Sequence, residues 1–460
     1  MSANAAAVPT DLDLSQEVPL GSAMLRQLTK NRGRRQAIDS TGDSLTGAQL
    51  LTKALVLRRL LQREVLGADE QRVGVLLPPA NGSVVVNAAL ALMGKVAVNL
   101  NYSASADVIK ACIKAAGLKH VLTTDKVMSK LGITLDCEAV KLDGLRDKVT
   151  LVDKLAGALG GYVLPAGMLE TRLGLDRVSL DDMVTIIFTS GSTGVPKGVV
   201  LSHRNIVANI RSFAQAVHLD SNDVIVGILP FFHAFGYTVT LWAPLILDLS
   251  GAYHFNPLDA KQVGKLCKKA GGTLLLSTPT FLRSYVKRVP AEDFATLEVA
   301  VVGAEKMPIP LADAFEKKFG VRPVEGYGAT ELSPVAAVNI PASRSRTTAT
   351  DLREGSIGLP LPGVKARVVD PDTRDELPAD TDGMLEVCGP NLMCGYLDDE
   401  AKTSEVVKDG WYVTGDIAKI DADGFIHITG RPAEPVQQDR RRDGAARPCR
   451  GGNPSPARHR

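Results

Sequence analysis

The sequence predicts an α/β protein with a large, parallel-rich α/β part followed by a small β-rich subdomain. Short apolar runs alternate with helix-like segments from residue 46 to 123 and again from 184 to 319, a pattern typical of parallel sheets covered by helices. From residue 355 to 430 the pattern changes to short β-like runs separated by Gly, Pro and Asp. A length of 460 residues fits two or three structural units.

In the first half of the chain, helices and strands alternate. Thr46 and Gln49 form a possible capping box ahead of leucines that repeat at helical spacing up to Leu61. The elements predicted next are a strand at 72–77, a helix at 83–93, a strand at 95–100, a helix at 106–116 and a strand at 120–123. Residues 138–179 are less regular, and we expect them to be peripheral.

After residue 184 the alternation resumes. The predicted strands are 184–188, 199–201, 223–229, 274–276 and 298–302, and the predicted helices are 203–217, 259–270, 280–287 and 312–319, with an apolar helix-like stretch near 242–249. Residues 344–354 are polar, so we expect a loop or a boundary there. In the β-rich part the predicted strands are 365–369, 383–388, 411–413, 417–420 and 425–428, with a hairpin turn at 421–424.

Composition excludes several classes of protein. The net charge of +2 does not indicate binding to nucleic acid. The six cysteines are scattered without metal-ligand spacing, which favours buried thiols in a reducing compartment. The N-terminus lacks a signal pattern. The most apolar stretches, 83–100 and 239–249, are interrupted or too short to span a bilayer. We therefore predict a cytoplasmic protein without a transmembrane segment; peripheral association with a membrane stays open.

The stretch 189–198, Thr-Ser-Gly-Ser-Thr-Gly-Val-Pro-Lys-Gly, has the composition of a phosphate-binding loop. Glycines let backbone N–H groups approach an anion, hydroxyls add donors, and Lys197 adds a mobile positive charge. A flexible surface loop is the alternative. The flanking apolar runs and the Pro-Lys-Gly ending favour phosphate binding. The loop is not a Walker loop, because Gly198 stands where Ser or Thr would bind the metal.

Four stretches, taken together, resemble the adenylate-forming superfamily, which includes acyl- and aryl-CoA ligases and acyl-carrier-protein synthetases. They are the loop 189–198, the pair Val302–Glu305 and Glu325–Glu331, the stretch Trp411–Asp416, and Gly430-Arg431. The resemblance covers roughly residues 20–431. It implies activation of a carboxylate with ATP to an acyl-adenylate and pyrophosphate, followed by transfer of the acyl group to a thiol.

The resemblance also implies a role for each matched residue at the phosphates. Phosphate oxygens would be held by Thr189, Ser190, Gly191, Ser192, Thr193 and Gly194. Lys197 would anchor this loop or its ligand, and Thr330 would hydrogen-bond the α-phosphate. Glu331 would carry Mg²⁺, a hard cation that prefers carboxylate and phosphate oxygens. Outside these motif matches, a glutamate such as Glu331 would more often be a solvated or capping side chain. An aspartate after glycine, such as Asp416, would more often be a turn residue.

At the nucleoside, the resemblance implies an adenine slot formed by Gly303, Ala304, Glu305, Gly326, Tyr327 and Gly328, with Tyr327 stacking on the base. The Glu305 side chain could instead be structural, with the adjacent backbone contacting adenine. Asp416 would accept hydrogen bonds from both ribose hydroxyls, and Arg431 would donate to the ribose.

An acyl pocket is implied for the aromatic run that begins at Phe231. His233, Phe235, Gly236 and Tyr237 would line it, with His233 orienting the carboxylate; a core histidine is the alternative. Three stretches, Phe232–Gly236, Ser277–Arg283 and Gly303–Lys306, resemble bacterial acyl-[acyl-carrier-protein] synthetases, including the synthetase half of acylglycerophosphoethanolamine acyltransferases. We therefore expect a fatty acid as substrate and acyl-carrier protein as the favoured acceptor, with coenzyme A as the alternative.

The resemblance breaks off at the C-terminus. In the superfamily a hinge and a lid domain with a catalytic lysine follow Gly-Arg, whereas residues 432–460 have seven Arg, five Pro and no Leu, Ile, Met or aromatic residue, too few apolar groups for a core. A basic interaction tail is one reading. We hypothesise instead a shifted reading frame, because another frame compatible with these residues encodes a hinge-like segment with Lys-Ile-Gly-Gly-Glu.

This hypothesis leaves a nucleotide- or acyl-binding remnant with impaired catalysis as the alternative to an active ligase. The predicted organisation is a disordered N-terminus (1–18), an α/β AMP-binding core (19–343), a β-rich subdomain ending at the hinge (344–431) and a disordered tail in place of the lid (432–460).

Overall fold

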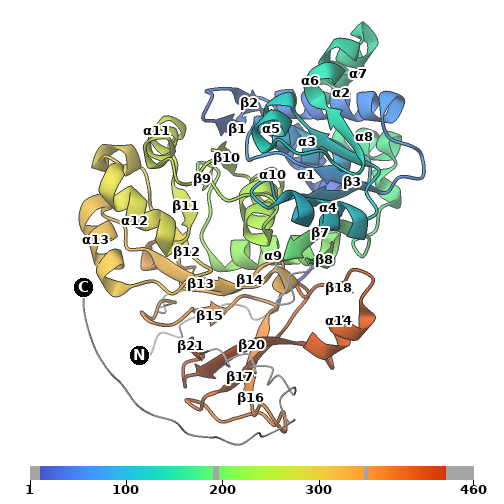
Figure 1. The fold of residues 1–460 in the computed structure, drawn as a ribbon. Helices are drawn as coiled ribbons and strands as arrows, with labels where there is room; N and C mark the ends of the chain where they lie inside the picture. Colours follow the sequence, from blue (N-terminus) through green and yellow to red (C-terminus); the bar gives the residue numbers. More distant parts are fainter. Residues whose placement is uncertain (1–10, 190–195, 347–350, 431–460) are drawn as a thin grey trace, which may run out of the picture.

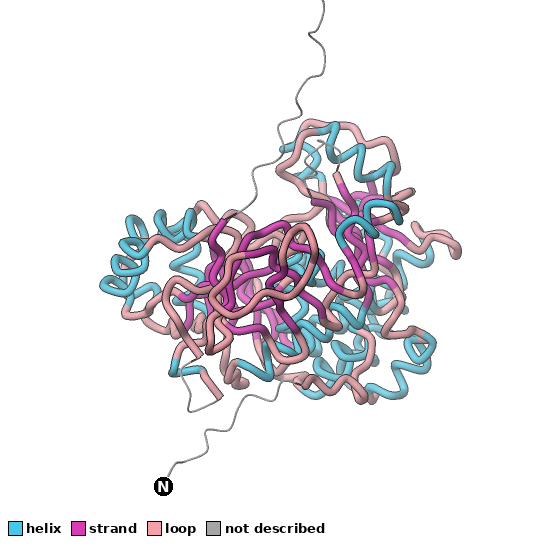
Figure 2. The backbone as a smooth tube through the Cα atoms, turned by 90° about the horizontal axis from the view of Figure 1, so that it is seen from below, coloured by secondary structure: helices cyan, strands magenta, loops and turns pink. Residues whose placement is uncertain are grey.

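The computed structural model describes residues 11–189, 196–346 and 351–430. Figure 1 shows a large α/β part with a smaller β-rich part below it. From below, the helices lie around the outside of the strands (Figure 2). These features confirm the predicted fold class.

The larger sheet has nine strands and is mostly parallel. Its order is β15 (Leu359–Pro360), β14 (Val335–Val338), β13 (Val324–Gly328), β12 (Val299–Val302), β11 (Leu274–Ser277), β9 (Val224–Gly227), β10 (Ser250–Tyr253), β1 (Arg35–Asp39) and β2 (Ser44–Thr46). All pairs from β13 to β1 are parallel, whereas β2, β14 and β15 add antiparallel edges.

The second sheet has seven strands. Its order is β18 (Gly395–Tyr396), β8 (Lys197–Ser202), β7 (Met183–Thr189), β4 (Val96–Asn99), β3 (Arg72–Val75), β5 (His120–Thr123) and β6 (Glu138–Lys141). The pairs between β7 and β6 are parallel, and β7, β8 and β18 pair antiparallel. Buried Val, Ile and Leu side chains fill both faces of these strands, as parallel sheets require.

Helices cover both sheets. They are α1 (Leu20–Lys30), α2 (Gly47–Glu64), α3 (Asn81–Ala91), α4 (Ala106–Ala115), α5 (Asp125–Leu131), α6 (Leu142–Leu145), α7 (Leu151–Tyr162), α8 (Ala166–Leu173), α9 (His203–Ala216), α10 (Ala243–Ile246), α11 (Ala260–Ala270), α12 (Pro279–Arg288), α13 (Ile309–Phe319) and α14 (Glu400–Val406). Gly236–Trp242 is π-helical and leads into α10. The predicted capping box at Thr46 and Gln49 is present at the start of α2.

Residues 138–179 are more regular than predicted. This stretch contains β6, which extends the seven-stranded sheet beside β5, and the helices α6, α7 and α8. The prediction of irregular structure was wrong because α7 packs through Gly157, Gly160 and Gly161, and glycines within a segment lower its apparent tendency to form a helix.

The β-rich part contains a five-stranded antiparallel sheet. Its strands are β16 (Lys365–Val369), β17 (Gly383–Cys388), β19 (Val407–Lys408), β20 (Trp411–Ile420) and β21 (Ile426–Gly430). The turn between β20 and β21 confirms the hairpin predicted at 421–424. The runs 411–413 and 417–420, predicted as separate strands, form one strand with a register shift. Two strands of the chain after residue 344, β15 and β18, pair with the large sheets.

Two segments expected to be loose make specific contacts. Within the predicted disordered terminus, residues 11–18 are described, and Glu17 pairs with Arg211 of α9 at 2.8 Å. At the predicted loop or boundary after residue 343, Arg344 is buried and donates to Asp223 and Glu298. The sequence could not reveal this ion pair, because its partners lie 121 and 46 positions away.

Two predictions from composition can be compared with the described residues. No helix among them is long and apolar enough to cross a membrane. The five cysteines in the described ranges are all free. The prediction that they are buried holds for Cys112 and Cys267 but is wrong for Cys394, which is exposed, and Cys137 and Cys388 are half-buried. Cys449 lies outside those ranges.

His203, at the start of α9, predicts a pH dependence of stability. Its buried Nδ1 accepts a hydrogen bond from the Leu20 N–H at 3.2 Å, and burial lowers its pKa to about 4. The unfolded chain takes up this proton near pH 6.5, so the free energy of unfolding should fall as pH drops from about 6.5 to about 4, by on the order of 3 kcal/mol.

Chemical denaturation of the wild type and of His203→Gln at pH 7 and pH 4 tests this expectation. The glutamine amide oxygen can still accept the Leu20 hydrogen bond, but the amide does not titrate. The wild type should lose on the order of 3 kcal/mol more than the variant over this range. Parallel pH dependences would contradict the assignment.

Candidate active site

A cavity of about 1150 Å³ is lined by residues that follow strands of both large sheets. Pro78 follows β3, Tyr102 follows β4, Pro230 follows β9, Thr278 follows β11 and Gly303 follows β12. Ligand sites of α/β proteins usually lie at the carboxyl ends of parallel strands. The topology therefore gathers loops distant in sequence around one space.

One wall of the cavity is formed by backbone at the ends of β12 and β13. Its lining includes Gly303, Ala304, Gly326, Tyr327 and Gly328, which the sequence predicts as the adenine slot. Ala304 has φ +68°, a left-handed conformation that costs a non-glycine residue about 1–2 kcal/mol. Such strained residues cluster at ligand sites. The structure thus brings the predicted slot residues together.

The Glu305 side chain does not join this wall. Its carboxylate accepts from the Thr280 hydroxyl at 2.8 and 3.0 Å, and Glu305 is not among the residues that line the cavity. This arrangement agrees with the structural alternative, in which the neighbouring backbone contacts the base.

A tyrosine–carboxylate hydrogen bond connects the slot to the β-rich part. The Tyr327 hydroxyl donates to Asp416 Oδ2 at 2.5 Å, although the two residues are 89 positions apart. Asp416 lies on β20 and is only 7% exposed. The predicted base-stacking and ribose-binding residues are therefore neighbours.

A second such bond joins Tyr396 and Glu331. The Tyr396 hydroxyl donates to Glu331 Oε1 at 2.7 Å, and the Lys197 ammonium lies 5.7 Å from the centre of the Tyr396 ring. Burial and the adjacent carboxylate raise the pKa of Tyr396, so the phenol keeps its proton at neutral pH. Thr330, next to Glu331, lines the cavity. The structure therefore groups three predicted catalytic residues, Lys197, Thr330 and Glu331.

Glu331, Asp416 and Lys197 border the cavity without lining it. Glu331 adjoins it through Thr330, and Asp416 adjoins it through Tyr327. Between Thr189 and Lys197 the sequence predicts a phosphate-binding loop. That loop contains the predicted phosphate ligands Ser190, Gly191, Ser192, Thr193 and Gly194, which lie outside the described residues, as does Arg431. Its two flanks are described: Thr189 ends β7 and pairs with Lys197 at the start of β8.

The donor set at Glu331 suits a magnesium ion held mainly by a ligand. Within the described ranges, no group of three or more His, Cys, Asp or Glu side chains could hold a metal. Mg²⁺ at phosphate sites typically takes one or two carboxylates and keeps waters and phosphate oxygens. One half-buried carboxylate beside the Thr330 hydroxyl fits that requirement.

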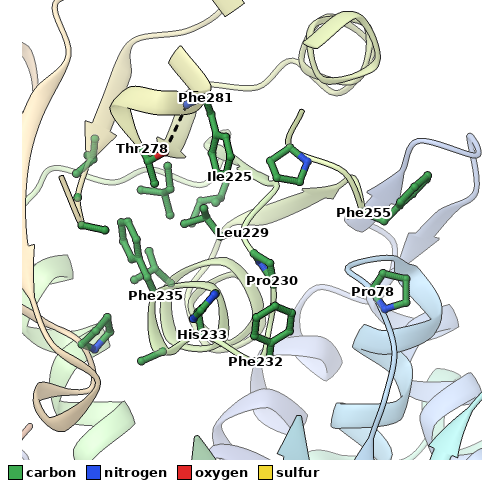
Figure 3. Close-up of a pocket in the computed structure, with 18 of the residues that line it drawn as sticks. Pro78, Ile225, Leu229, Pro230, Phe232, His233, Phe235, Phe255, Thr278 and Phe281 are labelled. Atoms are coloured by element: carbon green, nitrogen blue, oxygen red, sulfur yellow. Dashed lines mark hydrogen bonds between the residues drawn. The ribbon is translucent and has the colours of Figure 1, made fainter. Parts of the chain in front are cut away.

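Another part of the cavity lining is aromatic and aliphatic. Figure 3 shows Phe232, His233 and Phe235 along one side, with Thr278 and Phe281 from the start of α12 across from them. His233 faces the cavity and is accessible from it, and desolvation by the surrounding protein lowers its pKa below the ordinary value, so its imidazole is neutral at pH 7. The lining then continues along an apolar limb consisting of Phe213, Val217, Leu219, Ile225, Leu274 and Val299.

Two residues predicted for this pocket lie elsewhere. Tyr237 is fully buried in the core, with its ring edge-on to Trp242 at 6.1 Å. Gly236 allows a close approach of backbone: a Cβ there would lie 2.0 Å from the Pro230 carbonyl oxygen. The π-helical turn that begins at Gly236 directs Tyr237 away from the cavity while His233 and Phe235 face it.

Several residues of the site were not assigned a role from the sequence. Tyr396 is one of them, and nothing in the sequence indicates that it contacts Glu331. Tyr102 packs edge-on against Phe232 at 5.0 Å and lines the cavity. Thr278 and Phe281 belong to the stretch Ser277–Arg283, whose position directly after a predicted strand is the signal that could have identified them.

Comparison with known proteins identifies a family and a fold. Residues 25–397 match the model of the AMP-binding enzyme family. The chain is also similar to ATP-bound MatB from Rhodopseudomonas palustris, with 26% identity and a TM-score of 0.71 over 89% of this chain and 78% of that one. VinN has the same fold, with a TM-score of 0.76 at 23% identity over 91% of this chain and all of VinN.

Two similar relatives are named long-chain-fatty-acid–CoA ligases. The one from Bacillus subtilis is 26% identical over 462 residues, covering 91% of this chain and 78% of the relative. The one from Salmonella typhimurium is 32% identical over 268 residues, covering 56% of this chain and 46% of the relative. The match to the Salmonella protein thus spans less than half of its length.

The close approach of backbone at Gly328 predicts a strong effect of a small substitution. A Cβ at Gly328 would lie 2.0 Å from the Pro334 carbonyl oxygen, whereas one at Gly326, on the same strand, would have no neighbour nearer than 3.4 Å. Gly328→Ala should therefore lower the free energy of unfolding by about 1–3 kcal/mol or more, as overpacking does. Gly326→Ala is the matched control and should change it little. Equal stability of the two variants by chemical denaturation would refute this account.

Proposed function

The chain belongs to the AMP-binding enzyme family, and we propose that it activates a fatty acid with ATP to an acyl-adenylate and transfers the acyl group to coenzyme A. One observation carries the proposal: a single cavity joins the Tyr327 and Thr330 wall to a long apolar limb. Its volume of about 1150 Å³ exceeds the roughly 300–1000 Å³ of most small-molecule pockets. Such a space suits a nucleotide and an acyl chain bound together.

At the nucleotide end, the proposed contacts use groups that are already oriented. Tyr327 would stack on adenine while its hydroxyl holds Asp416, whose carboxylate would accept from the ribose hydroxyls. Thr330 would donate to the α-phosphate. The ATP-bound state of MatB, which is similar to this chain, supports ATP as the nucleotide.

The reaction needs stabilisation of negative charge as the carboxylate attacks the α-phosphorus and pyrophosphate leaves. Lys197 and Thr330 would supply a cation and a hydroxyl donor near this point. Glu331 would hold Mg²⁺, oriented by the Tyr396 hydroxyl; the ion supplies charge neutralisation at the phosphate oxygens. Neutral His233 would orient the carboxylate without adding charge.

The sequence favours acyl-carrier protein as the acceptor, whereas the proposed acceptor is coenzyme A. The proposal follows the relatives from Bacillus subtilis and Salmonella typhimurium, both named as CoA ligases of long-chain fatty acids. The same names, with the apolar limb, support a fatty acid as the substrate.

Nucleotide binding gives the first test. Asp416→Asn removes a charge but keeps an acceptor for Tyr327, and it should weaken ATP binding at least tenfold in calorimetry, since hydrogen bonds to charged groups contribute about 1.5–3 kcal/mol. Asp372→Asn, an exposed aspartate of the β-rich part, is the matched control and should bind ATP as the wild type does.

Turnover gives the second test. ATP–pyrophosphate exchange should depend on fatty acid and increase with chain length until the apolar limb is filled, and product analysis with each thiol should find acyl-CoA. ATP binding without exchange for any acid would indicate the nucleotide-binding remnant. If ATP–pyrophosphate exchange occurs but the acyl group is found only on acyl-carrier protein, the acceptor is acyl-carrier protein and not coenzyme A.

A further inference from the structure

Helix α7 presents its large apolar side chains to solvent. Seven side chains on and just after it are 46–70% exposed: Leu151, Val152, Leu155, Leu159, Tyr162, Val163 and, on α8, Met168. We refer to these seven residues as the α7 face. Contiguous apolar patches on soluble proteins mark interaction sites. In Figure 1, α7 projects at the end of the molecule opposite the five-stranded sheet.

The opposite side of α7 consists of glycines packed on α2. A Cβ added at Gly157, Gly160 or Gly161 would lie 2.5, 2.4 or 2.1 Å from a side chain of α2. Only a helix with hydrogen at these positions can approach α2 so closely. The packing of α7 therefore leaves its large apolar residues unused.

Polar contacts complete the attachment of α7. Asp153 is fully buried and pairs with Arg59 at 3.0 Å and Arg63 at 2.8 Å. Near the other end of the helix, Arg32 donates to the Gly161 carbonyl at 3.0 Å. Glycine packing and these bonds hold α7 in place, so folding does not account for the leucines and valines of its outer face.

The exposed charges of α7 and α8 are both positive. Lys154 and Arg172 are exposed. The two carboxylates of these helices are neutralised, Asp153 as described and Glu170 by Arg26 at 2.6 Å. An apolar surface with cationic residues and no free exposed carboxylate on its own helices is complementary to an anionic, partly apolar partner.

We propose that the α7 face binds the surface of a lipid bilayer that contains anionic lipids. The leucines and valines enter the boundary between headgroups and acyl chains, Tyr162 lies at headgroup level, and Lys154 and Arg172 contact lipid phosphates. The 12 residues of α7 make a helix about 18 Å long, which lies on a bilayer but cannot cross its ~30 Å core.

The charge of the face argues against a second copy of the chain as its partner. A second copy docked through the same face would place its exposed Lys154 and Arg172 opposite the same cations, and like charges repel. The proposal concerns binding only and does not depend on the proposed reaction.

Vesicle flotation with the whole chain tests the proposal. Wild-type protein should float with vesicles of phosphatidylcholine and phosphatidylglycerol, and Leu155→Ser with Leu159→Ser should reduce the bound fraction at least tenfold. Ile309→Ser removes a comparably exposed apolar residue of α13 (56% exposed) and should bind like the wild type. Lys154→Glu with Arg172→Glu should weaken binding to the anionic vesicles and abolish their advantage over phosphatidylcholine alone.

Three results would overturn the proposal. One is wild-type protein that fails to float with the anionic vesicles. Another is unchanged binding of both double variants. The third is a wild-type dimer in sedimentation velocity that Leu155→Ser with Leu159→Ser converts to a monomer, which would make the face a contact between copies. The charge-reversal variant keeps every apolar residue, so it remains informative if the serine variant unfolds.

Discussion

Two tyrosine–carboxylate hydrogen bonds determine how the site is assembled. Tyr327 on β13 donates to Asp416 on β20, and Tyr396 on β18 donates to Glu331 just after β13. The first bond connects the five-stranded sheet, and the second the seven-stranded sheet, to the end of the same strand of the nine-stranded sheet. A backbone hydrogen bond joins the same two segments, because the Met393 N–H donates to the Glu331 carbonyl at 2.8 Å. Without these contacts, the polar wall of the cavity would lose its connection to the strand that carries Asp416.

This arrangement separates the two tasks of the cavity. Its polar wall consists of backbone and fixed hydroxyls, which suit a nucleotide of constant shape. Its apolar limb buries whatever chain is bound, and each buried methylene contributes about 0.8 kcal/mol. Binding energy from the non-reacting part of a substrate can thereby position its carboxylate for reaction.

The sequence predicted the parts of the fold that depend on local pattern. The alternation of strands and helices, the capping box at Thr46 and the hairpin after Ile420 follow from neighbouring residues. The resemblance to the adenylate-forming superfamily named the slot residues, five of which line one wall of the cavity, and their contact with adenine stays a prediction. The sequence failed for Arg344, whose buried carboxylate partners are distant in sequence. It failed for Tyr237 as well, because the direction of a side chain in a π-helical turn does not follow from composition.

The glycine side of α7 has a consequence for how this protein can change over time. Stability resides on one side of the helix, in Gly157, Gly160, Gly161 and the buried Asp153 pair, and the outer side contributes little to it. Selection removes core substitutions that lower the free energy of unfolding below the level needed for function. Substitutions on the outer side of α7 change this free energy little, so they can accumulate. The surface chemistry of α7 can therefore diverge among related chains while the fold and the cavity stay the same.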